Sequence, residues 1–96
     1  MDNNAYVYIM ANRYRGTMYV GITNNLARRV HEHKTGTGSR FVARYALDRL
    51  VYYEPHDWIE GAIQRESQIK AWKRDWKIEL VESLNPDWKD LESELV

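Results

Sequence analysis

"YVYIMANRYRGTMYVGIT", residues 6–23, is the stretch that decides the fold of this chain. Residues 5–11 and 18–22 are rich in Tyr, Val and Ile, which favour β-strands. The segment Asn-Arg-Tyr-Arg-Gly between them has the composition of a turn. We therefore predict a β-hairpin.

Two tyrosines of this hairpin, Tyr8 and Tyr19, are candidates for a functional site. Because side chains alternate along a strand, a register that pairs residue 8 with residue 19 places both phenols on one side. A one-residue slip would separate them. Gly21 leaves space where a backbone or a substrate could approach closely. Aromatic side chains on strands also commonly belong to the core, so the pattern leaves both interpretations open.

The next segment, "NNLARRVHEHK" (24–34), predicts a short helix. It starts with Asn, a good N-cap, and its apolar residues lie four apart. At 100° per residue, Arg29 and His33 flank the apolar stripe, whereas Arg28 lies on the opposite side. In the structural alternative, the arginine packs its aliphatic part at the edge of the core and the histidine hydrogen bonds to the backbone.

A Gly/Ser/Thr loop follows at residues 35–40, and then a strand at residues 49–54 that Pro55 stops. A long helix begins after Asp57, its predicted N-cap, and a second helix at residues 75–84 ends at Asn85-Pro86. The last segment is an acidic tail at residues 87–96. The predicted order is β-β-α-β-α-α. It corresponds to one small α/β domain over residues 1–96, with its motifs in residues 5–86.

One carboxylate of the long helix stands out. Ile59, Ile63 and Ile69 form the predicted apolar stripe, and Glu66 falls inside it. A carboxylate that faces a core is unfavourable unless it is paired or bound to a cation. Lys70, four residues on, is a possible ion-pair partner, and a metal ion is the functional alternative.

The composition is that of an ordinary globular protein. The chain has 96 residues, of which 44% are hydrophobic and 29% charged, enough for one modest core. It has no cysteine, which excludes disulfide frameworks and cysteine-type zinc sites. The acidic N-terminus lacks a signal-peptide pattern, and no apolar run approaches a membrane span. We expect a cytoplasmic protein without membrane contact.

The formal net charge is zero, but the charge is unevenly distributed along the chain. Residues 1–53 carry eight Arg and Lys against three Asp and Glu, a net charge of +5. Residues 54–96 carry six against eleven, a net charge of −5. A neutral chain of this kind can present a basic face to phosphates, or its charges can simply be scattered over a solvated surface.

Taken together, these motifs resemble the GIY-YIG nuclease family, and within it the small single-domain bacterial branch. Tyr6-Val7-Tyr8 stands where the family has Gly-Ile-Tyr, and Tyr19-Val20-Gly21 stands where it has Tyr-Ile-Gly or Tyr-Val-Gly. The remaining family positions match Arg29, His33, Glu66 and Asn85. One departure is Tyr6 in place of the first glycine. The resemblance implies a three-stranded antiparallel sheet flanked by helices.

The resemblance also implies an endonuclease that hydrolyses DNA phosphodiester bonds, leaving a 3′-hydroxyl and a 5′-phosphate, in repair or recombination. Glu66 would hold one Mg²⁺ or Mn²⁺, hard cations that suit oxygen ligands. Arg29 would clamp the phosphate with its planar fork. Tyr8 would relay a proton from the attacking water. A free phenol has a pKa of about 10, so Tyr8 would need the metal cation and Arg29 to become a useful base.

Four further residues have supporting roles by the same resemblance. Tyr19 and His33 would position the water or share the proton. Gly21 and Asn85 would support the site without reacting. The chain would act as a monomer or a weak homodimer.

The segment that follows the short helix is a candidate for contacts with nucleic acid. It combines cations with aromatic rings, which suit phosphate contacts and base stacking: Lys34, Arg40, Arg44, Phe41 and Tyr45. The alternative is a solvated loop whose aromatic rings pack on the sheet.

Two other functions compete with the nuclease. One is a nucleic-acid-binding module that has the same fold and cuts little or not at all. The other is a protein-interaction domain that uses the acidic segment 82–96 together with Trp72, Trp76 and Trp88.

Overall fold

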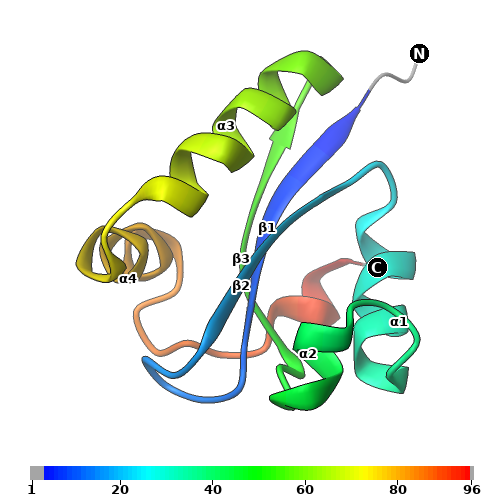
Figure 1. The fold of residues 1–96 in the computed structure, drawn as a ribbon, viewed down its shortest axis with the longest axis vertical. Helices are drawn as coiled ribbons and strands as arrows, with labels where there is room; N and C mark the ends of the chain where they lie inside the picture. Colours follow the sequence, from blue (N-terminus) through cyan, green and yellow to red (C-terminus); the bar gives the residue numbers. More distant parts are fainter. Residues whose placement is uncertain (1–3, 96) are drawn as a thin grey trace.

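The computed structural model describes residues 4–95, which form a three-stranded antiparallel sheet with helices on both faces (Figure 1). Strand β1 (Ala5–Ala11) is central, with β2 (Met18–Thr23) on one side and β3 (Arg49–His56) on the other. The helical elements are α1 (Leu26–Thr35), α2 (Arg40–Arg44), α3 (Ile59–Ala71), α4 (Arg74–Leu84) and the 3-10 helix η1 (Leu91–Leu95). The predicted fold class is confirmed, and α2 and η1 are short additions to the predicted order.

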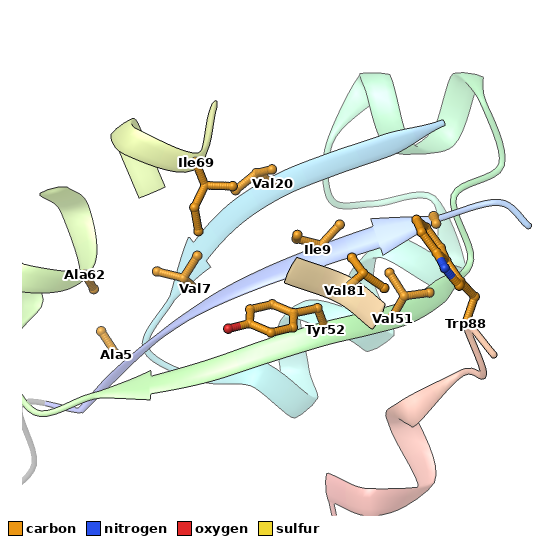
Figure 2. Close-up of a cluster of buried hydrophobic side chains, with 11 residues drawn as sticks. Ala5, Val7, Ile9, Val20, Val51, Tyr52, Ala62, Ile69, Val81 and Trp88 are labelled. Atoms are coloured by element: carbon orange, nitrogen blue, oxygen red, sulfur yellow. The ribbon is translucent and has the colours of Figure 1, made fainter. Parts of the chain in front are cut away.

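The sheet separates two clusters of buried apolar side chains. Figure 1 views the sheet nearly edge-on, with α3 and α4 on one side and α1, α2 and the C-terminal segment on the other. The cluster beneath α3 and α4 is drawn in Figure 2 and contains Ala5, Val7, Ile9, Ala11, Val20, Val51, Tyr52, Ala62, Ile69, Val81 and Trp88. The cluster beneath α1 contains Tyr8, Met10, Leu26, Val30, Val42, Leu47, Leu50 and Leu91. Alternate residues of β1 therefore serve two cores.

Two predicted boundaries are wrong. Pro55 does not stop the third strand, because β3 continues to His56 and pairs Pro55 with Tyr6. The edge position of β3 explains this, since an edge strand tolerates a residue without an N–H group. Asp57 does not cap the long helix. Trp58 is the N-cap residue of α3, and its side chain makes no capping hydrogen bond.

The predicted apolar stripe of α3 is also wrong. Ile59 and Ile63 are 41% and 50% exposed, whereas Ala62 and Ile69 are fully buried. Ala62 and Ile69 are seven residues apart and so lie on nearly the same side of the helix. The small alanine lets the helix backbone approach the sheet closely. Glu66 follows Ala62 by four residues, so it borders this buried side of the helix, and its side chain is 16% exposed.

The loop predicted over residues 35–40 ends one residue early, because α2 begins at Arg40. The Ser39 hydroxyl oxygen accepts hydrogen bonds from the backbone N–H groups of Phe41 (3.2 Å) and Val42 (3.5 Å). This cap organises a helix of five residues, too short to leave a periodic signal.

The acidic C-terminal segment is part of the folded body. Trp88 is fully buried, and its indole N–H donates to Glu82 at 2.8 Å. Trp88 therefore cannot take part in the predicted protein-interaction surface, although Trp76 is exposed. Glu82 also accepts two hydrogen bonds from Arg15, at 2.6 and 2.8 Å, so the hairpin turn is tied to α4.

Candidate active site

The hairpin places both tyrosines on the α1 face of the sheet. Tyr8 lies opposite Gly21, and Tyr19 lies opposite Met10. The register thus differs by two residues from the pairing of 8 with 19, and a shift of two keeps both side chains on the same face. Their ring centroids are 6.4 Å apart. The predicted juxtaposition of the two phenols is therefore present.

The position of the Tyr8 phenol requires a glycine at residue 21. A Cβ atom at residue 21 would lie 2.5 Å from Tyr8 Oη and 2.9 Å from Tyr19 Cε2, closer than atoms pack. The space that the sequence suggested for a backbone or a substrate is thus filled by Tyr8 itself.

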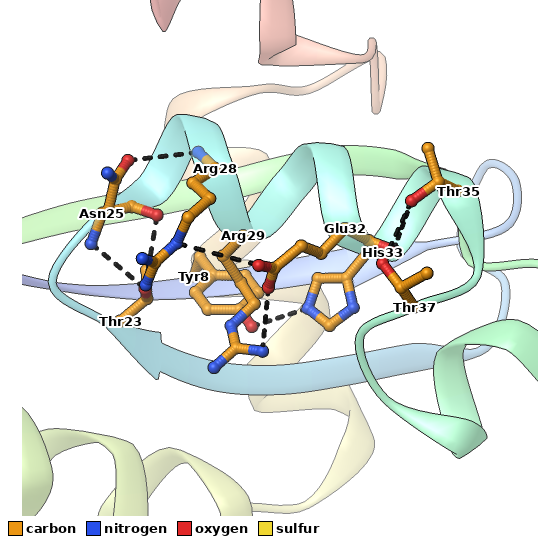
Figure 3. Close-up of polar contacts among 9 residues, drawn as sticks. All are labelled: Tyr8, Thr23, Asn25, Arg28, Arg29, Glu32, His33, Thr35 and Thr37. Carbon is orange, nitrogen blue, oxygen red and sulfur yellow. Dashed lines mark hydrogen bonds and ion pairs between the residues drawn. The ribbon is translucent and has the colours of Figure 1, made fainter.

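Helix α1 brings a histidine to the Tyr8 hydroxyl. The Asn25 side chain caps the helix by accepting from the Arg28 N–H, and Gly36 ends it with φ +82°. His33 lies on the buried side of α1 and is 4% exposed. A hydrogen bond of 2.7 Å joins His33 Nε2 to Tyr8 Oη, as Figure 3 shows.

The two adjacent arginines of α1 have different surroundings, as predicted. The Arg28 side chain is 60% exposed and that of Arg29 is 37% exposed. Arg29 Nη1 donates to Glu32 Oε1 at 3.3 Å, and Arg28 lies 3.8 Å from the other oxygen of the same carboxylate (Figure 3). Glu32 is a site residue that sequence reasoning missed, although its i+3 and i+4 spacing from the arginines is a signal.

The electrostatics of the site centre on Tyr8. Burial is the main cause of a raised pKa of Tyr8, and Tyr19, Glu66 and Glu32 add to it. The positive charge of Arg29 opposes this shift. The positive charge of Arg29 is thus the one named influence that favours the ionised form of Tyr8.

The same surroundings keep His33 uncharged. Burial is the main cause of a lowered pKa of His33, and Arg29 lowers it further, while Glu32 acts in the opposite direction. His33 is therefore a neutral imidazole at neutral pH.

Glu66 lies on α3, on the opposite side of the sheet from α1 (Figure 1). Its helix, α3, packs on β1 and β2, and its charge contributes to the raised pKa of Tyr8, so the carboxylate lies within electrostatic range of the phenol. Its ion-pair partner is Lys70, at 3.0 Å. The i,i+4 pair foreseen as the structural alternative is therefore present.

A metal ion at this site would have one protein carboxylate as its ligand. No group of three or more His, Cys, Asp or Glu side chains within residues 4–95 is arranged to hold a metal ion. Mg²⁺ is commonly bound through one or two carboxylates, with substrate phosphates and water completing its shell. The single carboxylate of Glu66 fits this kind of magnesium site.

The predicted nucleic-acid contacts divide into two groups. Arg40, Arg44 and Tyr45 are exposed on or next to α2. Lys34 instead has its ammonium group bound to Asp90 at 2.5 Å and to Glu92 at 2.6 Å. Its charge is thus neutralised by the C-terminal segment.

A row of aromatic rings connects α2 to the paired tyrosines. The ring centroids are 6.3 Å apart between Tyr19 and Phe41, and 4.8 Å apart between Phe41 and Tyr45. The Arg44 guanidinium lies 5.6 Å from the Tyr45 ring centroid. Phe41 and Tyr45 are each 43% exposed, so the row leads from the site to the surface.

Asn85 is placed outside this cluster. Its Nδ2 donates to the carbonyl oxygens of Val51 (3.0 Å) and Lys89 (2.8 Å), and its Oδ1 accepts from the Lys89 N–H (3.0 Å). Asn85 thus braces the turn after α4 against β3.

The helices of residues 4–95 are all too short or too polar to cross a membrane.

Comparisons with known proteins identify the family of this chain. Residues 4–79 match the model of the GIY-YIG catalytic domain. A UPF0213 protein of Natronomonas pharaonis is 38% identical over 81 residues, which cover 84% of this chain and 94% of that protein. One of Haloquadratum walsbyi is 34% identical over 82 residues, which cover 85% and 91%.

A solved structure is similar as well. The solution NMR structure of a UPF0213 protein from Bacillus halodurans superposes with a TM-score of 0.57 at 29% identity, over 91% of this chain and 92% of that one. The sheet, the paired tyrosines and these matches lead to one conclusion. The chain belongs to the GIY-YIG family, whose defining unit is a catalytic domain of the endonuclease type.

Proposed function

We propose that this chain is a divalent-metal-dependent endonuclease that hydrolyses phosphodiester bonds in DNA. The observation that carries the proposal is the buried hydrogen bond between Tyr8 and His33, with Arg29 beside it. A tyrosine, a neutral histidine and an arginine in one place suit proton transfer next to a phosphate. A role in DNA repair or recombination extends the proposal.

Arg29 is the proposed phosphate clamp. Its side chain is 37% exposed, and its partner Glu32 binds it through one hydrogen bond of 3.3 Å. A phosphate can accept two parallel hydrogen bonds from the guanidinium, which are stronger than that single contact. Substrate binding would therefore transfer Arg29 from Glu32 to the phosphate and leave its charge close to the Tyr8 oxygen.

Tyr8 is the proposed relay for the proton of the attacking water: it releases its own hydroxyl proton to bulk water and, as the phenolate, accepts the proton of the attacking water. Burial raises its pKa, so the phenolate needs support from its neighbours. Arg29 supplies a positive charge and His33 supplies a hydrogen-bond partner at 2.7 Å. Tyr19, whose ring lies between Tyr8 and Phe41, would hold the water in place.

Glu66 is the proposed ligand of one Mg²⁺ or Mn²⁺. When bound, such an ion would neutralise charge on the phosphate and its leaving oxygen. Lys70 Nζ forms an ion pair with Glu66 Oε2 at 3.0 Å, and the Lys70 side chain is 53% exposed. The ammonium group of Lys70 is therefore free to turn into solvent when a metal ion takes its place on the carboxylate.

The α2 surface is the proposed path of the nucleic acid. Phe41 and Tyr45 present exposed rings to bases, and Arg40 and Arg44 present charges to phosphates. Because Tyr19 touches this row of rings, a strand bound along it would reach Tyr8 and Arg29.

The test is a cleavage assay with Mg²⁺ or Mn²⁺ on supercoiled, branched and single-stranded DNA. The parent should cut at least one of them, and folded Tyr8→Phe should lose most of this activity, because the phenyl ring cannot accept a proton. Full activity in Tyr8→Phe would assign the cleavage to another site or to a contaminant.

A second candidate is a DNA-binding module that does not cut. The ion pair between Glu66 and Lys70 favours it, because it leaves the carboxylate neutralised. This function predicts that the parent binds DNA and cuts none of the three substrates, and that Glu66→Ala binds equally well.

A further inference from the structure

His33 has two ring nitrogens, and the fold gives a partner to only one. Nε2 lies 2.7 Å from Tyr8 Oη. Nδ1 is buried, and no hydrogen-bond partner for it exists among residues 4–95. A buried polar atom without a partner is unusual and calls for a physical reason.

Gly38 is the residue that borders this unpartnered nitrogen. A Cβ atom at residue 38 would lie 2.7 Å from His33 Nδ1 and 3.1 Å from His33 Cε1. The loop cannot easily move away, because the Gly38 and Thr37 N–H groups donate to the Glu32 carbonyl oxygen at 3.2 and 2.9 Å. Only a residue without a side chain leaves the imidazole in its observed position.

The pair is thus enclosed by two glycines. Gly21 lies against the Tyr8 hydroxyl, and Gly38 lies against the far edge of the His33 ring. The first belongs to a strand of the hairpin and the second to the loop between α1 and α2. Together they leave the space that the two rings occupy when Oη and Nε2 are joined by their hydrogen bond of 2.7 Å.

The unpartnered nitrogen also determines where the imidazole proton lies. A neutral imidazole carries one proton, on either Nδ1 or Nε2. A proton on Nδ1 would be a buried donor without an acceptor, and such orphaned N–H groups are rarer than acceptors that lack a partner. A proton on Nε2 has the Tyr8 oxygen as its acceptor.

We infer that Gly38 is a positioning residue for the Tyr8–His33 pair, and that His33 carries its proton on Nε2 and donates it to the Tyr8 oxygen. The hydroxyl hydrogen of Tyr8 is then not engaged by His33 and can face an incoming group. His33 acts as a donor that stabilises negative charge on Tyr8, and does not act as the base for its proton. The catalytic consequence rests on the proposed function, whereas the hydrogen bond itself does not.

The first test is nitrogen NMR of the full chain labelled with ¹⁵N-histidine, without DNA or metal. The chain has three histidines, and His31→Gln and His56→Gln assign the signals. We expect the His33 shifts of a protonated Nε2 and an unprotonated Nδ1. Folded Tyr8→Phe should lower the fraction protonated on Nε2. A proton on Nδ1 in the parent, or an unchanged ratio in Tyr8→Phe, would overturn the inference.

The second test compares Gly38→Ala with Gly61→Ala. Gly61 is a matched control because the nearest atom to its added Cβ is His56 Nδ1, at 3.9 Å. We expect Gly38→Ala to shift the His33 nitrogen signals and to slow cleavage on the order of 10- to 100-fold, the effect of a misplacement of about 1 Å. Gly61→Ala should change neither.

Equal behaviour of the two variants would overturn the positioning role of Gly38. If Gly38→Ala does not fold, the nitrogen shifts of the parent and of Tyr8→Phe still decide where the proton lies. If the parent cuts no DNA, the proposed function fails. The nitrogen signals of His33 still show whether its proton lies on Nε2, so the inference is tested independently of cleavage.

Discussion

Arg28 and Arg29 are neighbours in sequence, yet α1 directs them to different surroundings. The charge of Arg29 acts on both Tyr8 and His33. The Arg28 side chain is more exposed, at 60% against 37% for Arg29. One residue step along a helix thus separates an arginine of the site from an arginine of the surface.

Lysine substitutions test this difference while keeping the charge. Arg29→Lys should slow single-turnover cleavage on the order of 100-fold, because an ammonium group cannot make the two parallel hydrogen bonds to phosphate. Arg28→Lys, on the same helix, should cut at the parent rate. Equal losses in both variants, or none in Arg29→Lys, would rule out the clamp.

Much of the site at this scale could be predicted from the sequence, because α1 is regular and its periodicity separates Arg29 and His33 from Arg28. The contribution of Gly38 could not be predicted. It depends on how the loop after α1 folds back on the His33 ring, and the local sequence carries no signal for that contact.

At the scale of elements, the hairpin was the most predictable part, since its strand formers and turn residues agree. The orientation of α3 was not, because Ile59, Ile63, Ala62 and Ile69 are all apolar and local sequence cannot choose among them. In the folded protein, the side of α3 that carries Ala62 and Ile69 packs on the sheet. Helix α2 was missed because five residues held by a serine cap show no periodicity.

The hairpin turn depends on a charged contact with α4. Two hydrogen bonds from Arg15 are the main reason why the pKa of Glu82 falls from 4.5 to about 2. A carboxyl with a depressed pKa in the folded state adds stability that is fully present above about pH 4.5 and is lost as the pH falls toward 2.

Glu82→Gln should therefore lower the free energy of unfolding at neutral pH and flatten its decline between pH 4.5 and pH 2. Urea unfolding followed by circular dichroism across that range measures both effects. Glu79→Gln, an exposed position on α4, is the control. A parent-like decline in Glu82→Gln would show that this contact does not contribute.

At the scale of the whole molecule, the basic and acidic halves of the chain are joined by ion pairs. Lys34 binds Asp90 and Glu92, and Arg15 binds Glu82. Part of the positive charge of the N-terminal half is thus neutralised within the fold. The cations on α2, Arg40 and Arg44, are exposed and take part in no ion pair within residues 4–95.

Salt dependence of DNA binding tests this division of charge. Arg44→Gln should weaken binding and reduce the slope of log K against log salt by about 1, as expected for the loss of one phosphate contact. Lys34→Gln should leave the slope unchanged, because its charge is already paired. Fluorescence anisotropy with a labelled oligonucleotide gives both slopes. A smaller slope in Lys34→Gln would contradict this account.

We propose that Glu66 and the tyrosine-histidine-arginine cluster act together as one metal-dependent nuclease site. The most direct measurement is DNA cleavage as a function of Mg²⁺ for the parent, Glu66→Gln and Glu60→Gln, the last being an exposed glutamate of the same helix. We predict that Glu60→Gln retains the parent's metal dependence and that folded Glu66→Gln loses cleavage at every Mg²⁺ concentration. A parent-like Mg²⁺ response in Glu66→Gln would contradict the claim.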